Sequence, residues 1–428
     1  MQIISTSPRF FTILIVLIGC LTLFSVPVSS QSTFDFRSET IVRIFERENE
    51  ALSNEQVIPV YEYLQFDYGK PEGDGLSFHF NGWGRLDLGD SGYFEDDPDG
   101  SLLYAFMEYV HPRSNFQTRL GRQQVANVVT STSVDGLWLS STPIPWLGIS
   151  AYGGAPVALQ SADDRNNDIT YGARMFHRLG GYYEVGLAYK MVTGDLGDDD
   201  ERLGTDLFFS FPGGASLTGY SSQNLVTGGW GEHSYEVAFY LDDLYLKPYY
   251  QHISYEDFFN SGTFSARPFR FLSDTGETLN LIGGDVTWQT AGGLDIGVKY
   301  SNYDYKIRQE RSNYFGGLLN RSAGDALFGG EIGLMDGDAA ENSYLLTRAF
   351  FYWNQPFKLM NNSMFTGDIV YVLYEEEIYN KKSSLFASLG WGRRFLDDRL
   401  ELKLSGDYSV DPFFDSDLRG MVTVILRR

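Results

Sequence analysis

The sequence predicts an all-β protein that forms a single transmembrane antiparallel up-and-down β-barrel of about 22 strands, without a plug domain. Three observations lead to this prediction. Apolar and polar residues alternate with a period of two along nearly the whole chain. Aromatic residues make up 16% of the chain and there are 46 glycines, while the mean hydropathy is only −0.22. No stretch with a helical period is long enough to form helices over the apolar sheet faces, and a soluble β domain would need helices or a second sheet there.

The alternation also predicts which face of each strand meets water. Every second residue of Leu294–Ser301 is apolar, and the residues between them include Asp295 and Lys299. Leu76–Leu88 and Leu400–Tyr408 follow the same pattern. A period of two places alternate residues on opposite faces of a strand. Because Lys and Asp are costly toward lipid, we expect the apolar face to contact lipid and the charged face to line the interior.

The number of strands follows from the connections between them. With both chain ends on the same side of the membrane, this number must be even. The count is one strand short until Asn313–Asn320 is taken as a short strand, and totals of about 18 or 20 remain alternatives. The expected strands are roughly 33–46, 57–68, 75–88, 101–111, 115–124, 134–141, 145–153, 168–177, 182–193, 203–211, 215–222, 230–240, 244–255, 277–288, 293–306, 313–320, 326–336, 342–354, 363–375, 381–394, 399–409 and 418–428.

Two kinds of connection separate the expected strands. Short connections are expected at 111–115, 178–181, 212–215, 241–243, 290–293 and 396–398. Longer, acidic connections are expected at 90–100, 153–167, 194–202, 255–276, 375–380 and 410–417. Short periplasmic turns and long external loops are the usual asymmetry of outer-membrane barrels, so the sequence predicts an integral protein of the outer membrane.

The N-terminus is expected to be a cleaved signal peptide, residues 1–30, ahead of the barrel, residues 31–428. Phe10–Val26 is an apolar run, and small residues at 28–30 favour cleavage before Gln31. A retained membrane anchor is an alternative, but the run is short and no charged cluster follows it. Lipidation of Cys20 is a second alternative, although the apolar run continues beyond that residue.

The composition excludes several classes of function. A formal net charge of −23 argues against nucleic acid as a partner. Cys20 is the only cysteine, so a chain that begins at Gln31 holds no disulfide, no cysteine-based metal site and no attached c-type haem. We expect no cofactor and no metal site. Cation binding by acidic loops such as 195–201 is the alternative to a simple solvated surface.

An enzyme is not expected. His79 lies two residues from Ser77 on the same predicted face, which brings a base near a hydroxyl. A catalytic pair also needs a third group that orients the base, and donors that stabilise an oxyanion. The sequence identifies neither of them.

The charged residues of the inward parity are the candidate pore-lining residues. Mixed signs on a pore wall orient polar solutes and tune ion preference, whereas pairing across strands is the alternative role for such residues. The candidates are Arg85, Asp87, Arg119, Arg174, Glu184, Lys190, Lys247, Asp295, Lys299, Lys403 and Asp407.

Two segments are candidates for folding into the interior. A barrel of about 20 strands is too wide for side chains to fill. Because strands begin almost at Gln31, any filling would come from loops such as Val125–Ser133 or Tyr255–Gly276. The second loop is unusually apolar for an exposed tip, and we expect it to fold inward or to bind a partner. The residues concerned are Asp257, Phe258, Phe259, Phe264, Phe269 and Phe271.

Several short motifs carry a resemblance to a known group. Tyr61–Asp67 reads YEYLQFD and Phe78–Arg85 reads FHFNGWGR. Leu120–Gln123 (LGRQ) is followed by Asp135–Leu137 (DGL), and Gly406–Ser409 (GDYS) lies near the end. Together they resemble porin-like outer-membrane β-barrels of Gram-negative, anaerobic, metal-respiring bacteria. Some barrels of this kind are the sheath of porin–cytochrome conduits, in which a multihaem cytochrome crosses the membrane inside the barrel.

The function predicted from these observations is an outer-membrane channel. Small hydrophilic solutes or ions would diffuse passively through a water-filled interior, with no cofactor and no energy input. The alternative, implied by the resemblance, is a sheath around a periplasmic multihaem cytochrome, with electrons as the transported species.

Overall fold

The computed structural model describes residues 33–428 apart from 50–51, 70–73, 90–92, 95, 114, 158–167, 194–198, 260–275, 308, 339–341, 356–361 and 413–415. The signal peptide expected at residues 1–30 lies outside this part of the chain. Within the described part, no helix is both long and apolar enough to cross a membrane.

The described chain forms one sheet of 23 strands and a short helix, α2 (Tyr255–Phe259). The strands that run in one direction are β1 (Thr33–Asn49), β4 (Gly75–Asp87), β6 (Phe116–Asn127), β8 (Leu147–Pro156), β10 (Tyr183–Thr193), β12 (Ala215–Asn224), β14 (Leu244–Ser254), β16 (Leu294–Tyr305), β18 (Ala326–Gly337), β20 (Ser363–Ile378) and β22 (Leu400–Val410). The strands that run in the other direction are β2 (Leu52–Val57), β3 (Pro59–Gly69), β5 (Asp99–Val110), β7 (Thr130–Ile144), β9 (Ile169–Leu179), β11 (Asp200–Phe211), β13 (Trp230–Leu241), β15 (Thr278–Gln289), β17 (Arg311–Ala323), β19 (Tyr344–Asn354), β21 (Lys381–Phe395) and β23 (Asp417–Arg427).

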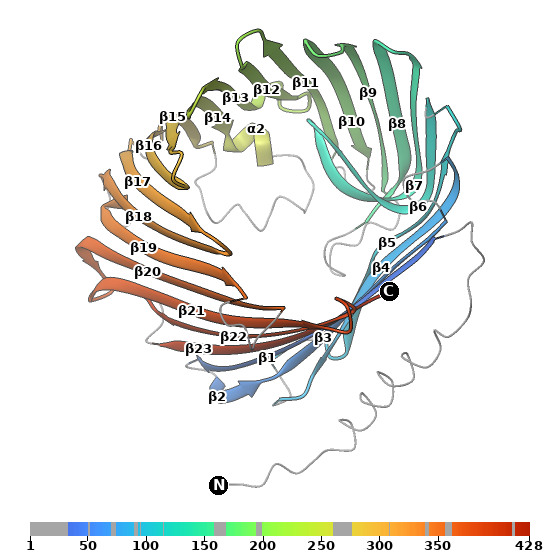
Figure 1. The fold of residues 1–428 in the computed structure, drawn as a ribbon. Helices are drawn as coiled ribbons and strands as arrows, with labels where there is room; N and C mark the ends of the chain where they lie inside the picture. Colours follow the sequence, from blue (N-terminus) through green and yellow to red (C-terminus); the bar gives the residue numbers. More distant parts are fainter. Residues whose placement is uncertain are drawn as a thin grey trace.

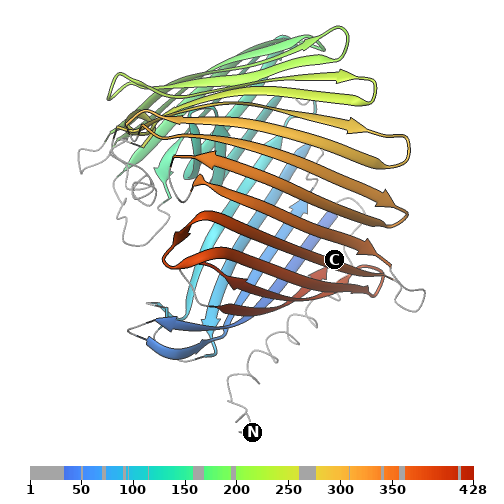
Figure 2. The same cartoon turned by 90° about the vertical axis from the view of Figure 1, so that its left-hand side faces the viewer.

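The sheet closes into a ring because β1 pairs with both β3 and the last strand. Thr33 to Val42 lie opposite Gly69 to Val60, while Arg37 to Phe45 lie opposite Arg427 to Arg419. β2 pairs only with the end of β1 and continues the path of β3, so 22 of the 23 strands form the barrel. Figures 1 and 2 show the ring from its end and from its side.

The predicted strands are confirmed in number and order, with corrections at their ends. The segment taken as a short strand, Asn313–Asn320, lies within the full-length β17. Val125–Ser133 was expected as a loop, but it is the end of a hairpin in which β6 and β7 are joined by two residues only. The long connection expected at Glu375–Asn380 is also short, because β20 continues to Ile378.

The two rims of the barrel differ. At the rim where the chain ends, β7 and β8, β13 and β14, and β17 and β18 are joined by two-residue turns. The opposite rim, which we call the long-loop rim, carries the connections 88–98, 157–168, 194–199 and 255–277, and in Figure 2 it lies on the left. Alternating short and long connections agree with the predicted pattern, in which both chain ends lie on the short-turn side.

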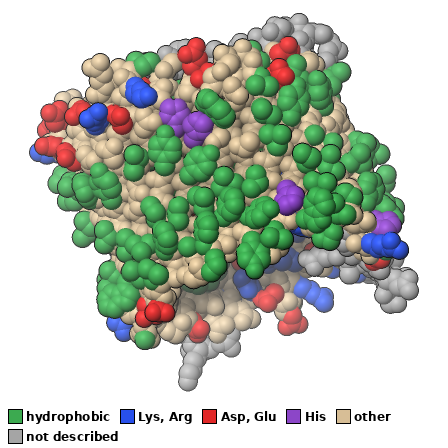
Figure 3. All heavy atoms as spheres, turned by 90° about the horizontal axis from the view of Figure 1, so that it is seen from above, with side chains coloured by type: hydrophobic (Ala, Val, Ile, Leu, Met, Phe, Trp, Pro, Cys, Tyr) green, Lys and Arg blue, Asp and Glu red, His purple; other side chains and the backbone are tan. Residues whose placement is uncertain are grey.

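The outer face of the wall is apolar. Leu389 and Ile332 are 67% and 62% exposed, and Val298 is 60% exposed, which would be unfavourable in water. Figure 3 shows hydrophobic side chains spread over the outer wall between the two rims. Buried apolar residues are few, because a single curved sheet has no second layer to pack against. The apolar face is thus suited to lipid rather than to a protein core.

Candidate functional site

The β6–β7 hairpin leaves the wall and enters the interior. β6 pairs with β7 along its whole length, from Phe116 opposite Ser141 to Asn127 opposite Thr130. Its pairing with β5 stops at Arg122 opposite Ala105. The last five residues of β6 therefore have strand pairing with β7 alone. Figure 1 shows the hairpin curving inward toward β10 and β11.

A row of glycines marks the place where the hairpin bends. Gly121 lies opposite Gly136, and Gly136 lies opposite Gly154 on β8. A Cβ atom on Gly121 would overlap the carbonyl oxygen of Ala105, and one on Gly136 would overlap that of Gly153. Gly121 also has a φ of +125°, which side chains disfavour. The three strands approach this closely only because the row has no side chains.

Arg122 holds the base of the hairpin. Its Nε and Nη2 each donate to one carboxylate oxygen of Asp135, both at 2.7 Å. Its Nη1 donates to the carbonyl oxygen of Leu102 at 3.0 Å. Leu102 lies in the part of β5 that β6 no longer pairs with, so the guanidinium replaces a lost ladder bond. A bidentate arginine pair is strong and directional, which suits a fixed branch point.

The end of the hairpin packs against the inner wall. Val125 and Val134 form a buried cluster with Tyr152 of β8, and Trp138 lies against it. A Cβ on Gly204 of β11 would meet methyl groups of Val128 and Val129 within 3 Å. The hairpin therefore reaches from its own position in the wall to β11, and it narrows the interior on that side.

A cavity of about 560 Å³ lies beneath the tip of the hairpin, between Asn127, Val128 and the wall of β9–β12. Arg174 lies in it and donates to Glu184 at 2.8 Å and, through two nitrogens, to Asp206. One cation therefore balances two carboxylates, so this part of the wall is negative. A negative wall attracts cations and repels anions as they pass.

The helix α2, at the start of the second candidate loop, lies inside the ring in Figure 1. Its carbonyl groups accept hydrogen bonds from two strands: Arg202 donates to Phe258 at 2.7 Å and Asn224 to Asp257 at 2.9 Å. The Asp257 carboxylate accepts from Thr227 and Ser254, both at 2.7 Å. Asp257 and Phe258 thus fasten the start of the loop to β11–β13. The remaining predicted loop residues, the Phe259 side chain, Phe264, Phe269 and Phe271, lie outside the described part.

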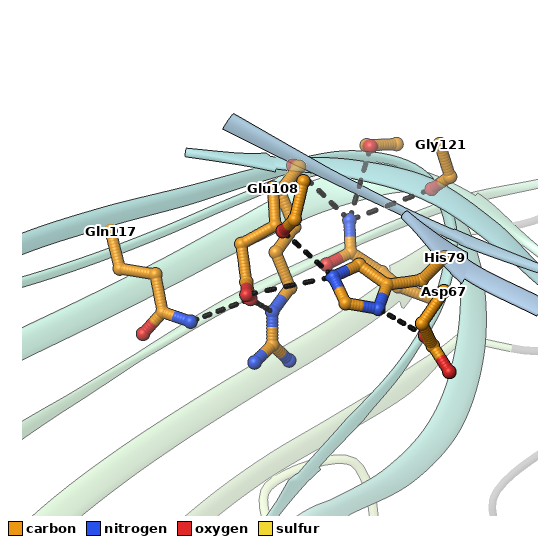
Figure 4. Close-up of polar contacts among 9 residues, drawn as sticks. Asp67, His79, Glu108, Gln117 and Gly121 are labelled. Atoms are coloured by element: carbon orange, nitrogen blue, oxygen red, sulfur yellow. Dashed lines mark hydrogen bonds and ion pairs between the residues drawn. The ribbon is translucent and has the colours of Figure 1, made fainter. Parts of the chain in front are cut away.

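A polar cluster on β3–β6 surrounds His79 (Figure 4). His79 Nδ1 lies 2.5 Å from Asp67, and Nε2 lies 2.9 Å from Ser77 Oγ and 3.7 Å from Glu108. The Glu108 carboxylate accepts from Gln117 and Arg119, each at 2.6 Å.

Asp67 is thus the orienting third group that the sequence did not reveal beside Ser77 and His79. However, Ser77 is only 4% exposed, so a substrate carbonyl has little access to its hydroxyl. We interpret this cluster as a structural network of the inner wall, which satisfies its buried polar groups by pairing.

The predicted pore-lining residues all lie on the parity opposite to the exposed apolar side chains, and most of them are paired. Arg119 binds Glu108, Arg174 binds Glu184 and Asp206, and Lys190 binds Asp200 at 2.6 Å. Lys247 lies 3.4 Å from Asp285, and Lys403 lies 3.3 Å from Glu401. Asp407 lies opposite Arg419 and Asp295 lies opposite Asn320 in the strand register.

The predicted pore-lining residues differ in how exposed they are and in what they contact, as three of them show. Arg85 is only 12% exposed, and it is held by the carbonyl of Asp96 and the carboxylate of Asp99 beneath the ring of Phe94. Asp87 is buried and accepts hydrogen bonds from backbone N–H groups. Lys299 is exposed, and its ammonium lies 5.7 Å from the ring of Tyr314. Lys299 is therefore the clearest candidate for a charge that a passing ion meets.

Sequence reasoning missed several partners of these residues. Glu108 and Asp206 are such partners, and they lie on the same inward parity. A further bidentate pair on this parity, Arg348–Asp368, was also missed, although the same alternation argument applies to it. The glycine row was visible as Gly121 and Gly136 within two quoted motifs, but nothing in the pattern indicated that they lie opposite each other.

Comparisons with known proteins add the following. No protein-family model matches the chain, and no curated protein matches it. Among solved structures, OccK8 (OprE) of Pseudomonas aeruginosa is 12% identical, with 93% of this chain and 98% of that chain covered and a TM-score of 0.43. OccAB4 of Acinetobacter baumannii is 10% identical, with 93% and 98% covered and a TM-score of 0.47. A BenF-like porin of Pseudomonas fluorescens Pf-5 is 10% identical, with 93% and 98% covered and a TM-score of 0.43.

Proposed function

We propose that this protein is an outer-membrane channel through which small hydrophilic solutes or ions diffuse passively. The observation that carries the proposal is the separation of surfaces on a closed ring. The outer face is apolar and exposed, whereas the inner face carries paired charges such as Arg174 with Glu184. Lipid outside and water inside satisfy both faces at once.

The inward hairpin supports a restricted channel rather than a wide pore. A ring of 22 strands is too wide for its own side chains to close. The hairpin of β6 and β7 lies along one side of the interior, and α2 is fastened nearby at Arg202. Both segments reduce the cross-section open to a solute, and both place protein groups beside its path.

The proposal includes export through the predicted signal peptide, residues 1–30, and insertion with the long-loop rim facing outward. That orientation follows the usual asymmetry of outer-membrane barrels. One of the structural neighbours is described as a BenF-like porin, and the same class of activity is proposed here. The narrower resemblance to barrels of metal-respiring bacteria stays a prediction.

The alternative of a sheath around a multihaem cytochrome is less suited to this interior. A sheath needs room for a protein along its whole length. The buried contacts of Val125 and Val134 hold the β6–β7 hairpin within that space. We therefore propose solutes or ions, rather than a cytochrome, as the contents of the barrel.

Planar-bilayer recording with the chain from Gln31 onward tests the proposal. We expect stable, ohmic single-channel steps. Replacing the exposed Lys299 by Glu adds negative charge to the path, so the reversal potential in a salt gradient should shift toward that of the cation. Arg113→Glu, on an exposed connection at the rim, is the control with the same charge change and should shift it less. Folded, inserted protein that passes no current would contradict the proposal.

A further inference from the structure

A row of polar residues crosses five strands on the outer face, near the long-loop rim. Ser221 of β12 lies opposite His233 of β13, which lies opposite His252 of β14, and this residue lies opposite Asn280 of β15. The next residue of the row is Asp304 of β16. Figure 3 shows two neighbouring histidine side chains among apolar ones on this wall.

The row belongs to the outer face and not to the interior. Tyr250 and Ile282 lie opposite each other on the same parity as His252 and Asn280, two residues further from the rim. They are 39% and 57% exposed within the apolar outer surface. Trp230, whose ring centroid lies 5.0 Å from that of His233, is also exposed. The histidine pair therefore lies where the apolar belt meets the rim.

The two imidazoles face each other and each is oriented by a hydrogen bond. Their ring centroids are 5.6 Å apart, with an angle of 36° between the planes. His252 Nδ1 lies 2.7 Å from Asn280 Oδ1. His233 Nδ1 lies 2.8 Å from Ser221 Oγ, which in turn lies 2.6 Å from the hydroxyl of Tyr235.

This arrangement has the features of a metal-ligand pair. Metal-binding histidines usually engage one ring nitrogen with a hydrogen-bonding partner, which orients the other nitrogen toward the ion. Here Nδ1 of each ring is engaged in this way, which leaves Nε2 as the ligand atom. Imidazole nitrogen suits Zn²⁺, Ni²⁺ and Cu²⁺, whereas Mg²⁺ and Ca²⁺ prefer oxygen.

We propose that His233 and His252 bind one divalent transition-metal ion at the outer rim of the barrel, each through Nε2. Within the described part of the chain, no group of three His, Cys, Asp or Glu residues is placed to share an ion. The protein thus supplies two nitrogens, and water completes the coordination. Cu²⁺ should bind most tightly of the three, following the general order of affinities.

The bound ion would link β13 to β14 at their ends and leave the channel interior unchanged. Because both ligands must be neutral, protons compete with the metal. Binding should therefore weaken as the pH falls. This property is independent of conduction.

The test is Cu²⁺ binding to the folded barrel in detergent, with a chain that carries no histidine tag. Electron paramagnetic resonance should show two equivalent or nearly equivalent nitrogens on one Cu²⁺, and calorimetry should show one ion per chain. His233→Ala and His252→Ala should each remove one nitrogen. His111→Ala, at the opposite rim, is the matched control and should change nothing.

The orienting residues provide a second readout. Asn280→Ala and Ser221→Ala leave both ligands in place, and each should weaken binding by about 10-fold to 100-fold. Heat-modified gel migration would verify that each variant is still a folded barrel. A folded His233→Ala protein that binds Cu²⁺ with the affinity and spectrum of the parent would overturn the proposal, as would a parent spectrum with a single nitrogen.

Discussion

The wall from β16 to β21 and the wall from β5 to β8 are built from the same alternating pattern but behave differently. In the first, β17 is paired along its whole length with both neighbours. In the second, β6 separates from β5 after Arg122 and turns inward. The difference shows that alternation specifies strands and faces, while a few residues decide whether a hairpin remains in the wall.

Those few residues are the glycines at the bend and the arginine beside it. Gly136 lies between Gly121 and Gly154, where the three strands leave no space for a side chain. By contrast, Gly317 of β17 has open space where its Cβ would be. The regular wall therefore has room for a side chain at Gly317, whereas the branch point has none at Gly121 or Gly136.

The largest effect is expected from Gly136→Val. Its side chain would overlap the backbone of Gly153 and Gly154, and the strands must move apart. We expect a loss of about 1–3 kcal/mol in the free energy of unfolding, measured by denaturant titration in detergent. Gly317→Val is the matched control, because it adds the same atoms to open space, and it should be nearly neutral. Equal losses in the two variants would contradict the comparison.

The next effect concerns Arg85 and Lys299, which occupy the two contrasting kinds of wall environment. The Arg85 side chain is largely covered by Phe94 and lies beside Asp99, whereas Lys299 is exposed. Arg85→Glu should destabilise the barrel by about 1–3 kcal/mol, because the new carboxylate then lies beside that of Asp99 and the carbonyl of Asp96 loses its donor. Lys299→Glu should change the reversal potential with an unchanged unfolding midpoint. A change in ion selectivity without destabilisation would contradict this, because it would mean that the Arg85 side chain is free in the interior.

A smaller effect is expected from Arg122→Ala. The change leaves Asp135 and the carbonyl of Leu102 without the guanidinium, at a cost of about 1–2 kcal/mol. Arg122→Lys should restore only part of this, since an ammonium cannot make the bidentate pair. The reference is Arg311→Ala, which removes an exposed ion pair with Asp304 and should cost less than about 1 kcal/mol. If both alanine variants lose the same free energy of unfolding, the Arg122–Asp135 contact is an ordinary surface ion pair.

The sequence predicted the strands well because period-two alternation persists through each of them. Both parities follow from Leu294–Ser301 and segments like it, and the even number of strands follows from the two kinds of connection. The strand bounds were wrong at Val125–Ser133, which was expected as a loop that could fill the interior and is the end of the β6–β7 hairpin. Alternation is the same for a hairpin in the wall and for one inside, so it cannot distinguish the two. Whether the hairpin lies in the wall or inside depends on Gly121 facing Gly136 and on contacts with Gly204, which are distant in sequence.

For the candidate site, the sequence predicted which face of the strand each residue lies on, but not which residue it pairs with. The inward parity of Arg174 and Lys190 is a local property, but their partners Asp206 and Asp200 depend on the register between strands. Register is set by turn lengths and by the whole ring, so no local pattern reveals it. The third member beside Ser77 and His79, Asp67 on β3, was missed for the same reason.

The most direct test of the central claim is the unitary conductance of a barrel with a shortened β6–β7 hairpin. An Asn-Gly turn placed between Gln123 and Val134, which lie opposite each other, removes the tip and keeps the base. Replacing only Val128 and Val129 by Asn-Gly is the control for the new turn. If the hairpin narrows a passive channel, the shortened barrel conducts in clearly larger steps than both the parent and the control. Equal steps in all three folded barrels would mean that the hairpin does not lie in the conducting path.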